Sequence, residues 1–179
     1  MSLFEVDIDG ITEEHLNSLC QNQVEESLTL EFKRELDLSK TKEKAEAAKD
    51  VSAMANTAGG RILYGVAEKT LPDGSKVADS ICPLTDAAIE SRLADVLYSS
   101  IHSRPQFRRR RVPVRNATGF VLVLEVDRAY SGDLHMVTGF KEHRFYRRGE
   151  QRTVLMTEPE KAWQRLRECG GVSPARGPI

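Results

Sequence analysis

Apolar side chains recur at helical spacing in several stretches of the chain. Residues 11–20 and 39–57 have them three or four positions apart, which predicts two helices that each bury one face. Gly59 and Gly60 follow the second of these stretches and indicate where that helix ends. A third helix is expected from Ile89 onward, where the same spacing returns.

Residues 26–33 alternate between apolar and polar side chains, which is the period of a strand. The apolar side chains from Leu28 to Phe32 are expected on the buried side of this strand, and Glu31 and Lys33 share the other side. The pattern therefore predicts a half-buried strand whose polar face is open.

Further strands are expected where β-branched, apolar or aromatic residues lie between turn residues. These segments are residues 61–67, residues 106–114, Phe120–Val126 and Arg144–Arg148. The loop at residues 116–119 predicts a hairpin between two of them. Near the end of the chain, Thr157 and Glu160 have the spacing of a capping box, which predicts a last helix.

The order of these elements predicts a single α/β (α+β) domain, in which helices pack on a mixed sheet. We expect residues 1–24 to be an N-terminal helical extension, residues 25–168 to be the domain, and residues 169–179 to be a flexible tail or linker. Three isolated cysteines without a CxxC pair predict reduced thiols and a cytoplasmic protein. No apolar run approaches the roughly 20 residues of a membrane helix, so no membrane partner is expected.

The formal net charge of −1 hides a division along the chain. Residues 1–103 carry ten Lys/Arg and nineteen Asp/Glu, a net charge of −9, whereas residues 104–152 carry twelve Lys/Arg and five Asp/Glu, a net charge of +7. Such asymmetry suggests a surface that binds a polyanion. The alternative is that folding pairs the two parts with each other.

Four consecutive arginines begin at Arg108, and on a strand Arg108 and Arg110 face the same way. Both faces of that strand cannot be buried, so at least one pair lies in water. Together with the arginines near residue 145 they can follow a phosphate backbone, and an aromatic side chain among them can stack on a base. The predicted nucleic-acid surface comprises Arg108, Arg110, Arg144, Tyr146, Arg147 and Arg148.

The turn after the second helix contains Asn56, Thr57, Gly59 and Gly60. Its backbone N–H groups can form a nest that holds a phosphate. The alternative is a tight turn that needs glycine only for its backbone angles, and the position at the end of a helix favours this alternative.

Two ordered blocks of sequence resemble the AlbA-like domain of the Schlafen proteins and its prokaryotic relatives. The first block is Glu26, Glu31, Phe32 and Lys33, in the arrangement E-x4-E-F-K. The second block comprises Ala53, Ala55, Asn56, Thr57, Gly59, Gly60, Leu63, Gly65 and Val66. Residues 132–136 and 144–149 are similar to two later segments of that family.

The resemblance implies a site of three acidic residues, as in the Schlafen nucleases. Two of them are Glu26 and Glu31, and the third is Glu68, where an aspartate is more usual in the family. Converging carboxylates bind Mg²⁺ or Mn²⁺, and Lys33 would then face the scissile phosphate. The alternative is a surface Glu–Lys pair on a strand.

Three functions follow from these observations. We expect a domain that binds DNA or RNA and that resembles relatives described as DNA-binding domains or transcriptional regulators. The first alternative is a metal-dependent endonuclease that uses Glu26 and Glu31, and the second is a protein-interaction module. The sequence leaves open a homodimer and a C-terminal domain beyond Ile179.

Overall fold

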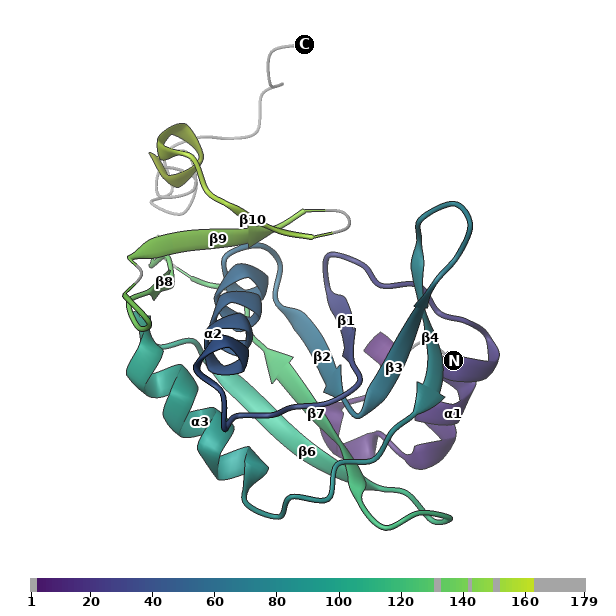
Figure 1. The fold of residues 1–179 in the computed structure, drawn as a ribbon. Helices are drawn as coiled ribbons and strands as arrows, with labels where there is room; N and C mark the ends of the chain where they lie inside the picture. The colour runs from purple at the N-terminus through teal and green to yellow at the C-terminus, as the bar shows by residue number, and fades with distance from the viewer. Residues whose placement is uncertain (1–2, 131–132, 142, 150–151, 163–179) are drawn as a thin grey trace.

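A four-stranded mixed sheet occupies the centre of the computed structural model, which describes residues 3–130, 133–141, 143–149 and 152–162 (Figure 1). The strand order is β1-β2-β7-β6, with bounds Leu30–Lys33 for β1, Gly60–Tyr64 for β2, Phe120–Val126 for β7 and Phe107–Pro113 for β6. Strands β1 and β2 are parallel, and helix α2 (Thr41–Ala55) connects them. Strands β2, β7 and β6 pair antiparallel.

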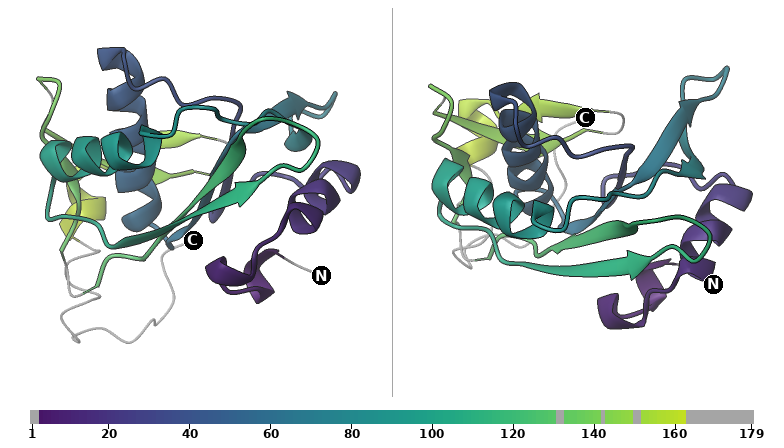
Figure 2. Two further views of the ribbon diagram at one scale, coloured as in Figure 1. Left: turned by 90° about the horizontal axis from the view of Figure 1, so that it is seen from below. Right: turned by 60° about the horizontal axis from the view of Figure 1, so that its bottom comes forward.

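Both faces of this sheet are covered. Helices α2 and α3 (Ile89–Ser100) bury one face, where Met54 and Leu93 belong to the same apolar cluster as Leu122. The other face lies against the 3-10 helices η1 (Leu3–Glu5) and η2 (Ile8–Gly10) and helix α1 (Glu13–Gln21), shown in purple in Figure 2. Strand β1, which was expected to be half-buried, is therefore covered on both faces.

The N-terminal segment is fastened to the sheet by a buried arginine. Arg61 of β2 is 5% exposed, and its guanidinium donates to the carbonyls of Leu3 and Val6 and to the carboxylate of Glu125. The segment expected as an extension therefore supplies part of the core.

A second sheet packs on α2 and has the order β10-β9-β8-β5. Its strands are β5 (Ile101–His102), β8 (Met136–Val137), β9 (Arg144–Arg148) and β10 (Thr153–Leu155), all antiparallel to their neighbours. Strands β3 (Val66–Thr70) and β4 (Lys76–Ile81) form a separate hairpin. Strand β3 of this hairpin lies beside β1 (Figure 1).

The expected mixed α+β class, the long helix at residues 39–57 and the hairpin of β6 and β7 are confirmed. The strand expected at residues 26–33 begins only at Leu30, and Leu28, expected on the buried side, is 41% exposed. The strand expected at residues 61–67 ends at Tyr64, because Gly65 has a φ of 99° and turns the chain into β3.

The capping box near the end of the chain is confirmed by its hydrogen bonds. Thr157 donates through its backbone N–H and its hydroxyl to Glu160 Oε2, at 2.7 and 2.9 Å. The tail expected at residues 169–179 lies outside the described residues. Within the described part of the chain, every helix is too short or too polar to cross a membrane.

Candidate functional site

Four charged side chains form a buried network between the two sheets. Strand β1 places Glu31 and Lys33 on the side that faces α2 and β9. Lys33 Nζ lies 2.6 Å from Glu31 Oε1 and 3.0 Å from Asp50 Oδ2 of α2. The second oxygen of Glu31 pairs with Arg148 of β9. The exposed fractions of Glu31, Asp50 and Arg148 are only 5%, 4% and 5%, so the polar face that was expected to be open is covered.

Arg148 holds several segments together. Its Nη2 donates to the carbonyl of Ser27 at 3.1 Å, and its backbone N–H donates to Thr57 Oγ1 at 2.8 Å. Thr57 in turn donates to the carbonyl of Ala53. The end of α2, the turn before β1 and strand β9 are therefore joined through one arginine, which stabilises the contact between the sheets.

The charged groups of this network shift one another's pKa values. Burial raises the pKa of Asp50 to about 6, and the negative charge of Glu31 adds to this, whereas Lys33 opposes it. Burial alone would lower the pKa of Lys33, but the carboxylates of Asp50 and Glu31 outweigh burial and raise it. Lys33 is therefore a permanent cation, and it cannot act as a general base near neutral pH.

A second pair of acids lies at the other side of β1. Glu26 accepts a hydrogen bond from the backbone N–H of Phe32 at 2.8 Å, and its carboxyl also bonds to that of Glu68. Burial raises the pKa of Glu26 to about 7, with a further contribution from the charge of Glu68. Glu68 is paired with Lys76. The carboxyl of Glu26 therefore holds its proton to a higher pH than an ordinary glutamate does.

The residues expected to hold a metal ion do not fit Mg²⁺ or Mn²⁺ as they are arranged. Both oxygens of Glu31 are engaged by cationic side chains, and Glu26 is bonded to Glu68 instead. Among the residues that the structure describes, no three His, Cys, Asp or Glu side chains are grouped to coordinate an ion. The sequence also missed Asp50, because a single aspartate on a predicted helix carries no sign that it faces a distant strand.

The backbone N–H donors of the turn after α2 are already hydrogen-bonded within the protein. The backbone N–H groups of Thr57, Ala58 and Gly59 point to the carbonyl of Met54, at 3.1, 3.2 and 2.9 Å. A Cβ on Gly60, whose φ is 141°, would lie 2.2 Å from the carbonyl oxygen of Thr29. This geometry favours a tight turn over a phosphate nest, because the donors are used and the glycines permit close packing.

The side chain of Asn56, in the same turn, is also fully used in contacts within the fold. Its amide donates to the carbonyls of His135 and Tyr146, at 2.9 and 3.0 Å, and accepts from the N–H of His135 at 2.8 Å. Asn56 is 2% exposed. It therefore serves backbone groups of the second sheet that would otherwise be buried without partners.

The four consecutive arginines of β6 each have an acidic partner. Arg108 pairs with Glu125 and Asp7, and Arg110 lies 3.8 Å from Asp9, on the side of the N-terminal segment. On the side of α3, the pairs are Arg109 with Glu90, at 3.3 Å, and Arg111 with Glu90, at 2.7 Å.

The expected residues of β9 lie in another sheet and face different ways. Tyr146 is 6% exposed and Arg148 is buried with Glu31, whereas Arg147 pairs with Glu160 at 2.7 Å. Arg144 is exposed and has no ion pair with a described residue. The structure therefore does not bring the arginines of β6 and β9 into one positive groove.

A different surface, at the end of the central sheet, presents two arginines that form no ion pair with a residue in the described ranges. We call Tyr98, Arg104, Arg128 and Tyr130 the end surface. The backbone N–H of Asp127 donates to the carbonyl of Gln106 at 3.0 Å, which places the segments of Arg104 and Arg128 side by side.

The side chains of the end surface suit an unpaired base and its phosphate. The guanidinium of Arg104 lies 5.5 Å from the ring centre of Tyr98. Tyr98 and Tyr130 are 45% and 76% exposed, and neither arginine has an ion pair with a described residue. Sequence reasoning missed this surface because its four residues are scattered between elements and form no charge run.

Comparisons with known proteins agree with the fold. The model of the family described as "Schlafen, AlbA_2" matches residues 26–156. The DIP2311 protein of Corynebacterium diphtheriae superposes with a TM-score of 0.52 at 19% identity, over 90% of this chain but only 28% of that protein.

A second solved structure is the N-terminal domain of a RecG-related protein of Nitrosomonas europaea, described as an ATP-dependent DNA helicase. It matches with a TM-score of 0.44 and 22% identity, over 80% of this chain and 93% of that domain. A search among curated proteins found no match. These likenesses concern the fold.

Proposed function

The chain belongs to the Schlafen AlbA_2 family, and from this membership we propose that it is a nucleic-acid-binding domain. The match from residue 26 to residue 156 includes every strand of the central sheet and of the second sheet, and it carries the proposal.

The end surface supports the proposal on physical grounds. Arginine without a carboxylate partner is free to form bidentate hydrogen bonds with phosphate oxygens. Exposed aromatic rings next to such arginines stack on unpaired bases without regard to sequence. We therefore assign single-stranded nucleic acid as the preferred ligand of Arg104 and Arg128, with Tyr98 and Tyr130 as stacking partners.

A protein-interaction module is a second candidate. The observation that favours it is the pairing of all four arginines from Arg108 to Arg111 with acidic side chains. Paired arginines contribute less to a polyanion site, since binding must first break the ion pairs.

A salt titration of binding separates the two candidates. Fluorescence anisotropy with labelled single-stranded DNA, single-stranded RNA and duplex DNA would be measured between about 25 and 200 mM salt. A nucleic-acid surface gives affinity that falls steeply with salt, because phosphate contacts release counterions. Failure to bind any of the three at the lowest salt would remove the proposal and leave the interaction module.

A further inference from the structure

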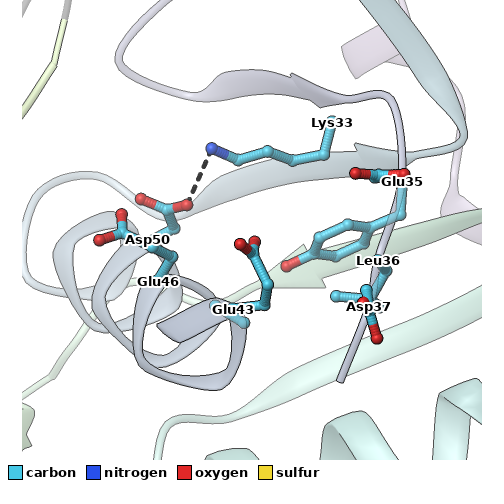
Figure 3. A pocket seen from close by; sticks show the side chains of 9 residues that line it. Lys33, Glu35, Leu36, Asp37, Glu43, Glu46 and Asp50 are labelled. Carbon is cyan, nitrogen blue, oxygen red and sulfur yellow. Dashed lines mark ion pairs between the residues drawn. The ribbon is translucent and has the colours of Figure 1, made fainter. Parts of the chain in front are cut away.

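An acidic pocket opens between α2 and the segment that follows β1. Its volume is about 140 Å³. Figure 3 shows Glu43, Glu46 and Asp50 of α2 on one side and Glu35, Leu36 and Asp37 on the other, with Lys33 reaching across to Asp50. Tyr64 and Ala47 complete the lining, which contains none of the residues assigned above to nucleic acid.

Two carboxylates of this pocket, Glu35 and Glu43, lie near the charge of Lys40 but are not in ion-pair contact with it. Asp37 pairs with Lys40 at 2.9 Å, Glu46 with Lys49 at 2.8 Å, and Asp50 with Lys33. By contrast, Glu35 and Glu43 form no ion pair with any residue in the described ranges. The mouth of the pocket therefore has an excess of negative charge.

The floor of the pocket has a hydrogen-bonding group without a partner. Tyr64 is 2% exposed, and its hydroxyl oxygen is buried without a hydrogen bond. A buried hydroxyl is normally bonded, and leaving it unbonded is costly. Burial, followed by the charge of Asp50, raises the pKa of Tyr64, so the hydroxyl stays neutral and can accept a hydrogen bond.

The shape and lining suit an organic cation better than a metal ion. Within the described residues, no three acidic or metal-binding side chains converge on one point. A water molecule takes about 30 Å³ in the liquid, so the pocket has room for a group of about four or five heavy atoms. Leu36, Ala47 and the ring of Tyr64 offer apolar contact to methylenes, and the ring face also attracts a cation.

We propose that this pocket binds the ammonium group of an aliphatic amine. Glu43 and Glu35 neutralise the charge at the mouth, and Tyr64 Oη accepts a hydrogen bond from the ammonium at the floor. The amine can come from a free polyamine or from a lysine side chain of a partner protein, since both present an ammonium on a chain of methylenes.

The test is calorimetric titration of the full chain at fixed ionic strength. The probes are 1,5-diaminopentane, spermidine and Nα-acetyl-lysine methylamide, with KCl as the reference for simple ion effects. We expect saturable binding of one amine per chain. Spermidine binding more tightly than the lysine derivative assigns a free polyamine, whereas equal or weaker spermidine binding assigns a lysine side chain.

Matched variants show whether the pocket is the site. Glu43→Gln keeps the size of the side chain and is expected to weaken binding by about tenfold or more, because it removes a charge-assisted bond. Tyr64→Phe removes only the unbonded hydroxyl, so the fold is retained, and binding should weaken by several-fold. Asp95→Asn, on the exposed side of α3, is the control and should bind as the natural sequence does. Equal affinity in all four proteins, or no saturable heat with any amine, would overturn the proposal.

Discussion

Glu31 and Arg148 lie 117 positions apart in the chain and form a buried ion pair between β1 and β9. This pair joins the central sheet to the second sheet, and Lys33 extends it to Asp50 of α2. Three of the four charged groups are almost completely buried, so each depends on the others for neutralisation. Glu31 and Lys33 of the E-F-K block therefore join the central sheet to the second sheet and to α2.

Removing Arg148 should destabilise the fold. Arg148→Met leaves Glu31 with Lys33 alone and removes one of the two donors to the Ser27 carbonyl, which keeps only the longer bond from the Leu30 N–H. We expect the free energy of unfolding to fall by about 3 kcal/mol, measured by urea denaturation. Arg144→Met, on the same strand but exposed, is the control and should change stability by less than about 0.5 kcal/mol. Similar losses in the two variants would contradict the role of the buried pair.

The raised pKa of Glu26 predicts a pH-dependent stability. Because its pKa is about 7 in the folded protein and 4.5 in the reference state, the folded chain binds this proton more tightly. The contribution favours folding below about pH 4.5 and is lost as the pH rises towards 7. Glu26→Gln keeps the size of the side chain and its acceptor oxygen but cannot ionise. The variant should therefore not lose this stability as the pH rises.

Urea denaturation of both proteins between pH 4 and 8 checks this expectation. The stability of Glu26→Gln relative to the natural sequence should increase by about 1 to 2 kcal/mol across that range, since solvent at this half-buried site screens part of the shift. A difference that does not change with pH would show that folding does not raise the pKa of Glu26.

Asn56 should be sensitive to truncation although it touches no candidate ligand. Asn56→Ala removes the three hydrogen bonds that its amide forms with buried backbone groups of His135 and Tyr146. We expect a loss of about 3 kcal/mol in the free energy of unfolding. Asn116→Ala, in the exposed loop between β6 and β7, is the matched control and should be nearly neutral. If Asn56→Ala retains full stability but loses nucleic-acid affinity, the turn binds ligand after all.

Divalent metal ions should leave the acidic residues undisturbed. Because Glu31 is engaged by Lys33 and Arg148, we expect Mn²⁺ at about 1 mM to leave the thermal unfolding midpoint unchanged. Nuclear magnetic resonance offers a local readout, since bound Mn²⁺ broadens nearby signals. Selective broadening at Glu26, Glu31 and Glu68 would mean that the carboxylates rearrange to hold a metal ion.

Much of the fold could be predicted because local pattern and tertiary environment agree. The small apolar residues of α2 recur at helical spacing and do pack against the sheet, and the hairpin of β6 and β7 follows its turn residues. The two-residue strands β5 and β8 could not be predicted, because so short a segment has no period. Strand β5 also finds its partner, β8, far along the chain, since Ile101 pairs with Val137.

The site was harder to predict because charge along the chain does not determine charge in space. Arg108 and Glu125 are paired only because β6 and β7 are neighbours in the sheet, which neutralises a segment that the sequence alone presents as basic. In the same way, Glu31 was placed on an open face because the sequence does not reveal that β9 covers it. Alternation predicts which side chains share a face, but it cannot show what packs on that face.

The central claim is that nucleic acid binds at the end surface and not along the paired arginines of β6. The most direct test compares two double variants, Arg104→Ser with Arg128→Ser, and Arg108→Ser with Arg110→Ser, by anisotropy with single-stranded DNA over a range of salt. The Arg104 and Arg128 variant should have an affinity at least about tenfold lower than the natural sequence. The slope of its log affinity against log salt concentration should be smaller by about two, because two phosphate contacts are lost. The Arg108 and Arg110 variant should keep its affinity within about twofold of the natural sequence. The account is contradicted if the β6 variant loses as much affinity as the end-surface variant, or more.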